Sequence, residues 1–389
     1  MGKDMRASNA DTGETGGIKV IRVLHVIGKM NHGGAEIMIM NYYRNIDRSV
    51  VQFDFVETSL EKAAFDDEIL SLGGRIYNCP FFNGLNYIEF KKWWNKFFEE
   101  HAEEYHIVHG HIGSSASIYL SIAKKYGLYA IAHSHDTSIS RSNFLYSITF
   151  RCLSYRTRYI ADYFFGCSKA AIIDRFGEKT ANGEKSKVLP VAIDVDRFVY
   201  NEKIRLEIRK ELGLESAFVI GHVGRFVPVK NHAFLLEVFD QFLKLHKEAK
   251  LLLIGDGETR SKIEAKAKYM GIFDACIFLG ICNNVNEIIQ AMDIMVFPSI
   301  YEGLGITLIE AQASGLPCII SQGVPEESMV VKQICKRVSL EDPVLKWVQE
   351  VGNSMNIERE AHKEEIVSAG YDIKEMAKWL QKFYCKHTC

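Results

Sequence analysis

Apolar residues along the chain gather in short runs that alternate with longer stretches of helical spacing. In the first half, runs rich in β-branched and aromatic residues predict strands at Lys19–Ile27, Val51–Glu57, Arg75–Cys79, His106–His111, Tyr129–His135, Tyr163–Ser168 and Lys187–Val191. The second half repeats the rhythm at Phe218–Val223, Lys250–Ile254, Cys276–Leu279, Ile294–Pro298 and Cys318–Ser321. This α/β alternation predicts parallel sheets with crossover helices, and the continuous apolar runs predict strands covered on both faces.

The rhythm divides the chain into two domains. The break falls near Asp194–Glu202, where a charged stretch replaces the apolar pattern. We expect Rossmann-like, doubly wound parallel-sheet domains over residues 18–195 and 196–370, facing a central cleft, because ligands of such sheets bind beyond the carboxyl ends of the strands. Residues 1–17, rich in Gly, Ser, Thr, Asn and Asp, are expected to form a flexible tail, and residues 371–389 a C-terminal helix.

The composition disfavours several classes of protein. The 389 residues carry a formal net charge of −2, which gives no support for nucleic-acid binding. The nine cysteines include no Cys-x-x-Cys pair, so a cysteine-based zinc site is not expected. Their scatter along the chain favours a reducing, cytoplasmic compartment. No run reaches the roughly 18 to 20 apolar residues that span a bilayer, so any contact with a membrane would be peripheral.

Two carboxylates, Glu302 and Glu310, bracket the run EGLGITLIE. A helix is predicted over Ile306–Ala313, which places Glu310 in its first turns. An ionised carboxylate accepts two hydroxyl hydrogen bonds, as a ribose diol requires, and Glu302 is placed to hold a hexose hydroxyl. The alternative is an acid that only stabilises a helix start. The free backbone N–H groups at this start can receive phosphate or sugar oxygens, at Gly305, Ile306 and Thr307.

Two cations follow the predicted strand Phe218–Val223 in a loop that begins with a glycine. Arg225 presents a fork of donors to phosphate oxygens, whereas Lys230 is a mobile point charge. Together they would stabilise a diphosphate as a leaving group, and Asn231 is placed to cap the next helix. The alternative is a pair of solvated loop charges. Cations and acids at two strand-to-helix junctions together predict a nucleotide-sugar site.

A glycine pair, Gly33 and Gly34, follows the first predicted strand and opens a helix. Glycine permits the backbone to approach a phosphate closely, although a plain strand-to-helix turn is the alternative. The preceding residues lack the Gly-x-Gly-x-x-Gly pattern of dinucleotide sites and the Gly-Lys-Ser/Thr ending of a P-loop. An oxidoreductase is therefore disfavoured.

Histidines end two neighbouring predicted strands, at positions 109, 111, 133 and 135. A metal cluster would fit this composition, but it would not need the cation pair and the acid pair. We therefore favour one histidine that reaches a reacting sugar from the first domain and choose His135, nearest the strand tip. His133 shares its strand parity, so the choice between the two stays open. The others are expected to pack or to support it.

Two segments leave a peripheral membrane contact open. The span Thr137–Ala161 has no acidic residue and contains Arg141, Arg151, Arg156 and Arg158. It would suit an anionic membrane or a lipid-diphosphate acceptor, or it is a packed helix with a solvated basic face. Aromatic residues at helical spacing fit a core-facing helix as well as a membrane edge, at Trp93, Trp94, Phe97 and Phe98.

Several segments of the chain belong together: GGAE (33–36), GHVGRFVPVKNH (221–232), LLIGDGE (252–258), AMDIMVFPS (291–299) and EGLGITLIEAQASGLP (302–317). They resemble the retaining family 4 glycosyltransferases of GT-B fold, in particular the branch that makes bacterial capsule and exopolysaccharide. The resemblance extends from about residue 18 to the end of the chain.

The resemblance implies a hexosyl- or N-acetylhexosaminyltransferase that needs neither metal nor cofactor. Its expected donor is a UDP-sugar, and its expected acceptor is a glycan or a polyprenyl-diphosphate-linked sugar at the inner face of the membrane. The terminal helix is expected to cross back onto the first domain. The positions that match the family's site are Arg225 and Lys230 for the diphosphate, Glu310 for the ribose, Glu302 for the hexose, Gly34 for the phosphates and His135 for the donor sugar.

Two other functions stay open. A sugar-nucleotide epimerase of GT-B fold would form product without an acceptor, and a non-catalytic sugar-nucleotide or glycan-binding protein would bind without turnover. The chain departs from the family at Ile281-Cys282, which affects base recognition, and at Gly305-Ile306, which affects hexose selectivity.

Overall fold

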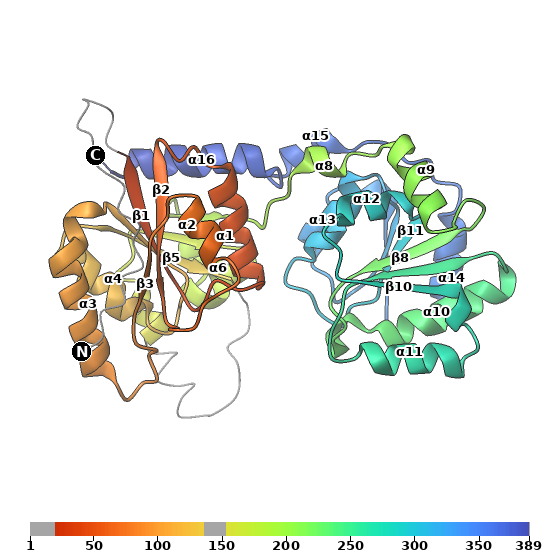
Figure 1. The fold of residues 1–389 in the computed structure, drawn as a ribbon, viewed down its shortest axis with the longest axis horizontal. Helices are drawn as coiled ribbons and strands as arrows, with labels where there is room; N and C mark the ends of the chain where they lie inside the picture. Colours follow the sequence, from red (N-terminus) through yellow and green to blue (C-terminus); the bar gives the residue numbers. More distant parts are fainter. Residues whose placement is uncertain (1–19, 136–152, 389) are drawn as a thin grey trace. The chain divides into compact units, whose positions relative to one another are not determined.

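The computed structural model describes residues 20–135 and 153–388. They form two units, each built around one parallel sheet with helices on both faces (Figure 1). The first unit comprises the described residues up to Ala192 and those from Ile373 onward, and the second comprises Ile193–Asp372. The prediction of two Rossmann-like parallel-sheet domains is therefore confirmed.

The sheet of the first unit has seven strands in the order β3-β2-β1-β4-β5-β6-β7, and every neighbouring pair is parallel. The strands are β1 (Ile21–Ile27), β2 (Val51–Glu57), β3 (Ile76–Asn78), β4 (Ile107–Gly110), β5 (Tyr129–Ser134), β6 (Tyr163–Gly166) and β7 (Ser186–Val188). Successive residues of each strand face opposite sides, so the apolar runs supply two cores at once.

Two layers of helices cover this sheet, on opposite sides in Figure 1. On one face, α1 (Gly34–Asn45) and α16 (Ile373–Lys386) share a core with Val23 and Ile107. On the other, α3 (Tyr87–His101) and α4 (Ala116–Lys125) pack against Leu24 and Val108. Among the described residues, the other α-helices of this unit are α2 (Asp66–Ser71), α6 (Lys169–Phe176) and α7 (Glu178–Ala181).

The aromatic residues of helix α3 were expected to face either the core or a membrane edge, and their burial decides between the two. Trp94, Phe97 and Phe98 are buried in the core under this helix, and Trp93 packs against them from a half-buried position. Full burial of an aromatic side chain stabilises a fold by about 1.5–3 kcal/mol. These aromatic residues therefore belong to a core-facing helix. None of the described helices combines the length and apolarity needed to cross a membrane.

The sheet of the second unit has six strands in the order β10-β9-β8-β11-β12-β13, again all parallel. They are β8 (Val219–Val223), β9 (Lys250–Ile254), β10 (Cys276–Gly280), β11 (Ile294–Phe297), β12 (Cys318–Ser321) and β13 (Cys335–Val338). The predicted strands agree with these to within a residue or two at each end, but β13 was not predicted. Its central residues, Lys336 and Arg337, are exposed, because β13 is the edge strand.

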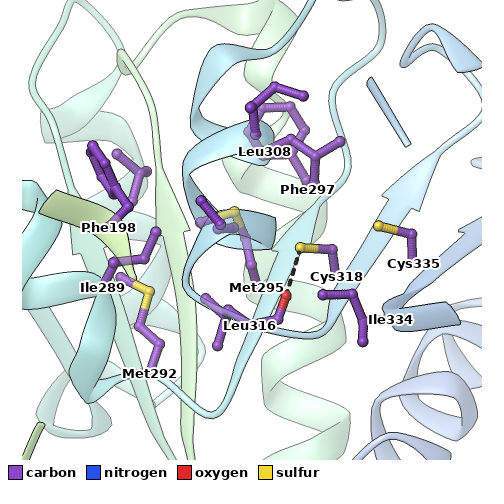
Figure 2. Close-up of a cluster of buried hydrophobic side chains, with 14 of the residues drawn as sticks. Phe198, Ile289, Met292, Met295, Phe297, Leu308, Leu316, Cys318, Ile334 and Cys335 are labelled. Carbon is purple, nitrogen blue, oxygen red and sulfur yellow. Dashed lines mark hydrogen bonds between the residues drawn. The ribbon is translucent and has the colours of Figure 1, made fainter. Parts of the chain in front are cut away.

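Helices also cover both faces of the second sheet (Figure 1). Helices α10 (His232–Leu245), α11 (Arg260–Tyr269) and α14 (Val344–Asn353) pack on one face. The other face carries α8 (Val195–Phe198), α12 (Val285–Ile288), α13 (Ile306–Ala313) and α15 (Lys363–Ser368). Figure 2 shows the core under α13, where Phe297 and Leu308 lie close together and the thiol of Cys318 donates to the Leu316 carbonyl (3.2 Å). Helix α9 (Glu202–Glu211) packs beside α12.

Both sheets reverse their strand order beside the first strand of the unit. In the first unit the chain moves outward from β1 to β3 and returns to β4, on the other side of β1. In the second unit it moves outward from β8 to β10 and returns to β11. Ligands of open α/β sheets bind at such switch points, beyond the carboxyl ends of the strands. The loops after β1, β4, β8 and β11 are therefore the places to look for function.

Candidate functional site

The switch point of the second unit brings together the predicted cation loop and the predicted acid loop. The Lys230 ammonium lies 2.6 Å from Oε1 of Glu302, and both side chains are mostly buried, with 18% and 10% of their surfaces exposed. The same ammonium lies 4.9 Å from the centre of the Phe297 ring. The amide of Ile300 donates to the Val229 carbonyl (2.8 Å), which joins the two loops through their backbones. Lys230 and Glu302 thus form one charged pair at the switch point.

Arg225 lies in the same loop with an exposed side chain. No hydrogen bond or ion pair of its guanidinium is found within the described parts of the chain. Its backbone, by contrast, is fixed by two hydrogen bonds from the flanking residues. The Gly224 amide donates to the Ile254 carbonyl (3.0 Å), and the Phe226 amide donates to the Asp256 backbone carbonyl (2.9 Å). The loop after β9 can approach the Gly224 backbone this closely because residue 255 is a glycine, at a φ of 127°. A side-chain carbon on Gly255 would lie 2.1 Å from the Gly224 carbonyl oxygen. The loop after β9 therefore holds the backbone of the loop after β8 in place, and the Arg225 side chain extends from that backbone into solvent.

The start of α13 lies beside this pair. Gly305 precedes the helix in the left-handed region, at a φ of 70°, with no side-chain cap. A side-chain carbon on Gly305 would lie 3.5 Å from the Phe297 ring and 3.8 Å from Cγ of Glu302. Leu308 is the first residue of the helix whose amide donates within it, to the Gly305 carbonyl (2.8 Å). The amides of Ile306 and Thr307 are thus left to bind a ligand, next to the Lys230–Glu302 pair.

Two glycines of this loop provide a matched test of the backbone. Gly305→Ala is expected to destabilise the protein by about 1–2 kcal/mol, because a side chain disfavours the left-handed conformation. Gly303→Ala is expected to change stability by a few tenths of a kcal/mol, because no atom lies within 4 Å of the added carbon. Thermal or denaturant unfolding of both variants measures the difference, and equal stabilities would contradict this account of Gly305.

Glu310 lies one turn further along α13 and is partly exposed. Desolvation by its surroundings raises the pKa of this carboxyl to about 8, and the Arg197 guanidinium of α8 opposes the shift. We expected an ionised carboxylate from the sequence. In this structure burial instead favours the protonated acid at neutral pH, which can donate one hydrogen bond and accept others. No hydrogen bond or ion pair joins Glu310 to Arg225 or Lys230 among the residues the structure describes.

Glu310 should make stability depend on pH. The ordinary pKa of its carboxyl is 4.5 and the folded value is about 8, so between these values the folded protein keeps a proton that the unfolded chain has released. Stability therefore falls as pH rises through this window. Glu310→Gln has no such proton to release. From pH 5 to pH 8 its free energy of unfolding should therefore rise relative to that of the wild type by at least about 1.4 kcal/mol. Unfolding curves across this range measure the gain, with Glu207→Gln, at an exposed position of α9, as the control. A difference that does not change with pH would contradict the assignment.

In the first unit, the predicted glycine pair opens α1. Gly33 is the residue before the helix, and Oε2 of Glu36 lies where a side chain on Gly33 would be, 2.2 Å from the position of its first carbon. Burial raises the pKa of this acid, and a hydrogen bond to its own backbone opposes the shift. At Gly34, by contrast, no atom lies within 4 Å of an added carbon. A phosphate that approaches Gly34 would therefore find open backbone, but it would have to displace the Glu36 carboxylate from the helix start.

The predicted histidines lie on one face of the sheet with a fifth, His25 of β1. β1 and β4 place His25 beside His109, and β4 and β5 place His109 beside Ile131. Hydrogen bonds link the Nδ1 of His25 to the Nε2 of His111 (3.0 Å), and the Nδ1 of His111 to the Nε2 of His135 (2.7 Å). Burial lowers the pKa of His135 to about 4, so its ring is neutral at pH 7. The Nε2 of His135 is thus bonded to His111, and no hydrogen bond of its Nδ1 is found among the described residues.

A second hydrogen-bonded chain runs behind the first. The Nδ1 of His109 is bonded to the Tyr384 hydroxyl of α16 (2.7 Å), and its Nε2 to the Nδ1 of His133 (3.1 Å). Burial, followed by repulsion from neighbouring histidines, lowers the pKa of His25, His109, His111 and His133 well below the ordinary value. Each of His133 and His135 has one ring nitrogen bonded to another histidine. Access distinguishes them, since His133 is 2% exposed and His135 is half-buried.

Three residues of these clusters were not predicted from the sequence: His25, Tyr384 and Glu36. The parity of His25 with the other histidines could have signalled its place, since all five lie on the side of the sheet that α1 and α16 cover. Asn231 was expected to cap α10 with its side chain, and this is wrong: it makes no such bond and instead takes a left-handed backbone conformation, at a φ of 55°.

The basic span 137–161 lies mostly outside the described residues, including Arg141 and Arg151. Within the described part, the Arg158 guanidinium donates to the Arg175 carbonyl (3.3 Å) and stacks on the Tyr155 ring (4.7 Å). Arg158 is therefore engaged by the fold itself, while Arg156 is exposed. A cavity of about 830 Å³ lies near the amino ends of the strands in the first unit, lined in part by Tyr105, Leu128 and Tyr129. This is the sheet edge opposite the switch point.

Two parallel-sheet units of this kind are also found in glycosyltransferases of GT-B fold. The solved structure of Anabaena Alr3699/HepE in complex with UDP shares it, with a TM-score of 0.74 and 16% identity over 94% of this chain and 100% of that one. The family model described as glycosyl transferases group 1 matches residues 204–341.

Curated relatives agree with the fold. "Putative glycosyltransferase EpsF" of Bacillus subtilis (strain 168) is 34% identical over 93% of this chain and 96% of its own length. "Capsular polysaccharide biosynthesis glycosyltransferase CapH" of Staphylococcus aureus is 25% identical over 95% of this chain and 100% of its own length. The chain therefore belongs to the glycosyl transferases group 1 family and is a glycosyltransferase.

Proposed function

We propose that this enzyme is a retaining transferase of family 4 that moves a hexose or N-acetylhexosamine from a UDP-sugar to a surface-polysaccharide acceptor. The observation that carries the proposal is the charged switch point of the second unit. There the Lys230 ammonium, the Glu302 carboxylate and the uncapped start of α13 lie together. A cation, a carboxylate and free helix amides side by side suit a diphosphate with an attached sugar.

Lys230 and Arg225 stabilise the negative charge that develops on the departing diphosphate. The amides of Ile306 and Thr307 add two donors at the same place. Glu302 is released from Lys230 when phosphate replaces it, and its carboxylate is then free to accept a hydrogen bond from the hexose. The two cations supply the charge for which other transferases use a metal ion, so we expect the transfer step to need none.

The remaining candidates bind the parts of the substrates that flank the reacting bond. Glu310 holds the ribose hydroxyls, either as the acid or, once a bound donor lowers its pKa, as the carboxylate. In the first unit, the open backbone at Gly34 contacts a phosphate and the Nδ1 of His135 contacts the transferred sugar. We assign no covalent nucleophile at the switch point of the second unit, and the resemblance to family 4 implies attack on the same face as the leaving phosphate.

The names of similar proteins support the donor and the pathway. HepE binds UDP, and CapH is named for capsular polysaccharide biosynthesis. The acceptor is then a growing glycan or a polyprenyl-diphosphate-linked sugar, and the enzyme works at the cytoplasmic face of the membrane through a peripheral contact.

Nucleotide release tests the proposal. Thermal shifts of the purified chain with UDP-, GDP- and ADP-sugars first select the donor, since a bound ligand raises the melting temperature. Release of the nucleotide is then measured with lipid-linked and soluble glycan acceptors, and the anomeric configuration of the product is read by NMR. Glu310→Ala should lower turnover by about 10-fold or more, whereas Glu207→Ala should not. Equal turnover in all three proteins, or an inverted product, would contradict the proposal, and product without an acceptor would indicate an epimerase.

A further inference from the structure

We propose that the loop between β3 and α3 inserts apolar side chains into the surface of an anionic lipid bilayer. The loop follows the carboxyl end of β3 in the first unit and leads into the first turn of α3 (Figure 1). It therefore lies at the same edge of the sheet as Gly34 and His135, which follow β1 and β5. The inference rests on the proposed function only for the lipid-linked acceptor, and it names the surface that would meet the membrane.

Large apolar side chains are exposed at this loop and beside it. Leu60 is 86% exposed on the neighbouring loop, which follows β2, and the side-chain amide of Asn78 at the end of β3 donates to the Ser59 carbonyl of that loop. Apolar residues that gather at a surface mark a contact with another molecule, whereas single ones need no explanation. The most exposed residues of the loop before α3 are Leu85 (94%), Ile88 (70%) and Phe81 (62%).

The loop holds its own shape. Phe82 is buried in the core that α3 covers, so it anchors the loop between exposed residues. The Oδ1 of Asn83 accepts from the amides of Leu85 (2.9 Å) and Asn86 (3.0 Å). The Asn86 side chain in turn accepts from the Asn83 amide (3.1 Å) and donates to the Phe81 carbonyl (2.8 Å). Backbone groups with partners inside the loop can enter an apolar layer at a much lower cost than unpaired ones.

The charges beside the loop fit anionic headgroups. Lys91 and Lys92 are exposed in the first turns of α3, and the single acid among residues 80–92 of the sequence is Glu89. The Lys91 ammonium lies 6.0 Å from the centre of the Tyr87 ring. A tyrosine next to a lysine suits the boundary of a bilayer, because the ring can enter the apolar layer while the cation stays among the headgroups. Anionic lipids attract lysines held this close to their surface.

A lipid layer suits these side chains better than a protein partner does. Leu60 and Leu85 are so exposed that they touch little of their own chain and project from it. A protein would need a fitted pocket for each of them, since protein interfaces pack as densely as protein interiors, whereas fluid acyl chains need none. Glu61 and Lys62, next to Leu60, carry charges that cancel, so the loop after β2 contributes apolar surface alone.

Contact at this place would serve a lipid-linked acceptor. β3 lies two strands from β1, which is about 10 Å in a sheet. A docked loop therefore brings the switch point of the first unit near the level of the headgroups. The diphosphate of a polyprenyl-linked sugar lies at that level, so the membrane would present the acceptor to the edge of the sheet that carries Gly34 and His135.

Vesicle flotation tests the surface without any activity. The purified full chain is mixed with vesicles of phosphatidylcholine alone, or of phosphatidylcholine with an equal part of phosphatidylglycerol. The wild type should float with the mixed vesicles. Replacing two side chains together, Leu85→Ser with Ile88→Ser, should lower the partition coefficient by about 10-fold or more. Lys91→Ser should lower it by about 5-fold on the anionic vesicles only.

Leu245→Ser is the matched control, because Leu245 is 70% exposed at the end of α10 in the second unit and should not change flotation. Melting curves check the fold of each variant. Leu85→Trp adds a second readout, since brominated lipid should quench the emission it adds to that of the wild type, and should not do so for Leu245→Trp. The proposal is wrong if the wild type stays unbound with both kinds of vesicle, or if the double variant floats like the wild type. A dimer in solution that the double variant loses would assign the loop to a second copy of the chain and would also overturn it.

Transfer assays separate this proposal from the proposed function. The double variant should transfer sugar to a soluble glycan at the wild-type rate, and to a polyprenyl-diphosphate-linked sugar in mixed vesicles about 10-fold more slowly. Vesicle binding that depends on Leu85 and Ile88, without any sugar transfer, would keep the surface and contradict the function. Equal transfer to the lipid-linked acceptor by both proteins would keep the function and overturn the surface.

Discussion

Replacing Lys230 by alanine is expected to lower the kcat/KM of sugar transfer by about 10²–10³-fold. The reason is position as well as charge. The Lys230 ammonium is mostly buried, held over the Phe297 ring and against Glu302, so little water screens it. A cation held in place before the reaction stabilises the charge that appears on the leaving diphosphate without having to reorganise. Arg225 remains in this variant, but its side chain is exposed, so water screens its charge and it should compensate only in part.

The same substitution should also cost stability, because it leaves the Glu302 carboxylate without its partner. Removing one member of a buried pair is more damaging than removing both. Glu302→Ala in the Lys230→Ala background should therefore recover part of the lost stability, with a coupling of about 0.5–3 kcal/mol between the two sites, but none of the lost activity. This separates a cation that binds the diphosphate from one that only neutralises an acid.

Steady-state rates with the selected donor, and unfolding curves of both single variants and the double variant, provide the measurements. Lys332→Ala is the control, since Lys332 forms an ion pair of the same type with Glu326 in the same unit, but with both side chains about 70% exposed. If Lys230→Ala retains the activity of Lys332→Ala, Lys230 does not act on the leaving group, and the switch-point pair is only structural.

Local signals predicted the second unit well. The glycines and charged residues of 224–230 and 302–305 stand out because they interrupt apolar runs, and their order along the chain was enough to assign them to strand ends. Edge strand β13 was missed because its exposed Lys336 and Arg337 break the apolar run. The pairing of Lys230 with Glu302 could not be predicted, since it depends on two loops that are 72 residues apart in sequence.

Burial limits what the sequence says about chemistry. Glu310 was placed correctly on α13, but its protonation depends on the groups that surround it in space. The histidine array likewise depends on neighbours in space. His25 lies more than 80 residues before His109 and comes to lie beside it only because β1 pairs with β4. Residue type and spacing gave the candidates, and the sheet register decided which of them meet.

A second large effect is expected far from the chemistry, at Asp293 of the segment AMDIMVFPS. Asp293→Ala should destabilise the second unit by about 3–5 kcal/mol. Its carboxylate forms ion pairs with Arg205 and with Arg209 of α9 (3.1 Å for Arg209) and accepts from the Val219 amide of β8 (2.7 Å). One acid thus joins α9 and β8 at the start of β11. Its loss removes the only acidic partner found within the described chain for two mostly buried arginines, which keep bonds to backbone carbonyls alone, and removes the acceptor of a strand amide.

Differential scanning calorimetry of the full chain measures this effect, and a loss of that size corresponds to a fall in melting temperature on the order of 10 °C. Asp240→Ala is the matched control, because the Asp240 side chain is about as exposed (18%) as that of Asp293 (19%) but pairs within α10 with Lys244, which is 56% exposed. Its loss should cost less than about 1 kcal/mol. If both variants melt alike, the carboxylate does not join the elements. We expect Asp293→Ala to lower stability and to leave the kcat of the folded fraction unchanged, because Asp293 supports the switch point without contacting the substrate. Lys230→Ala should do the reverse: it should lower kcat/KM strongly and stability less.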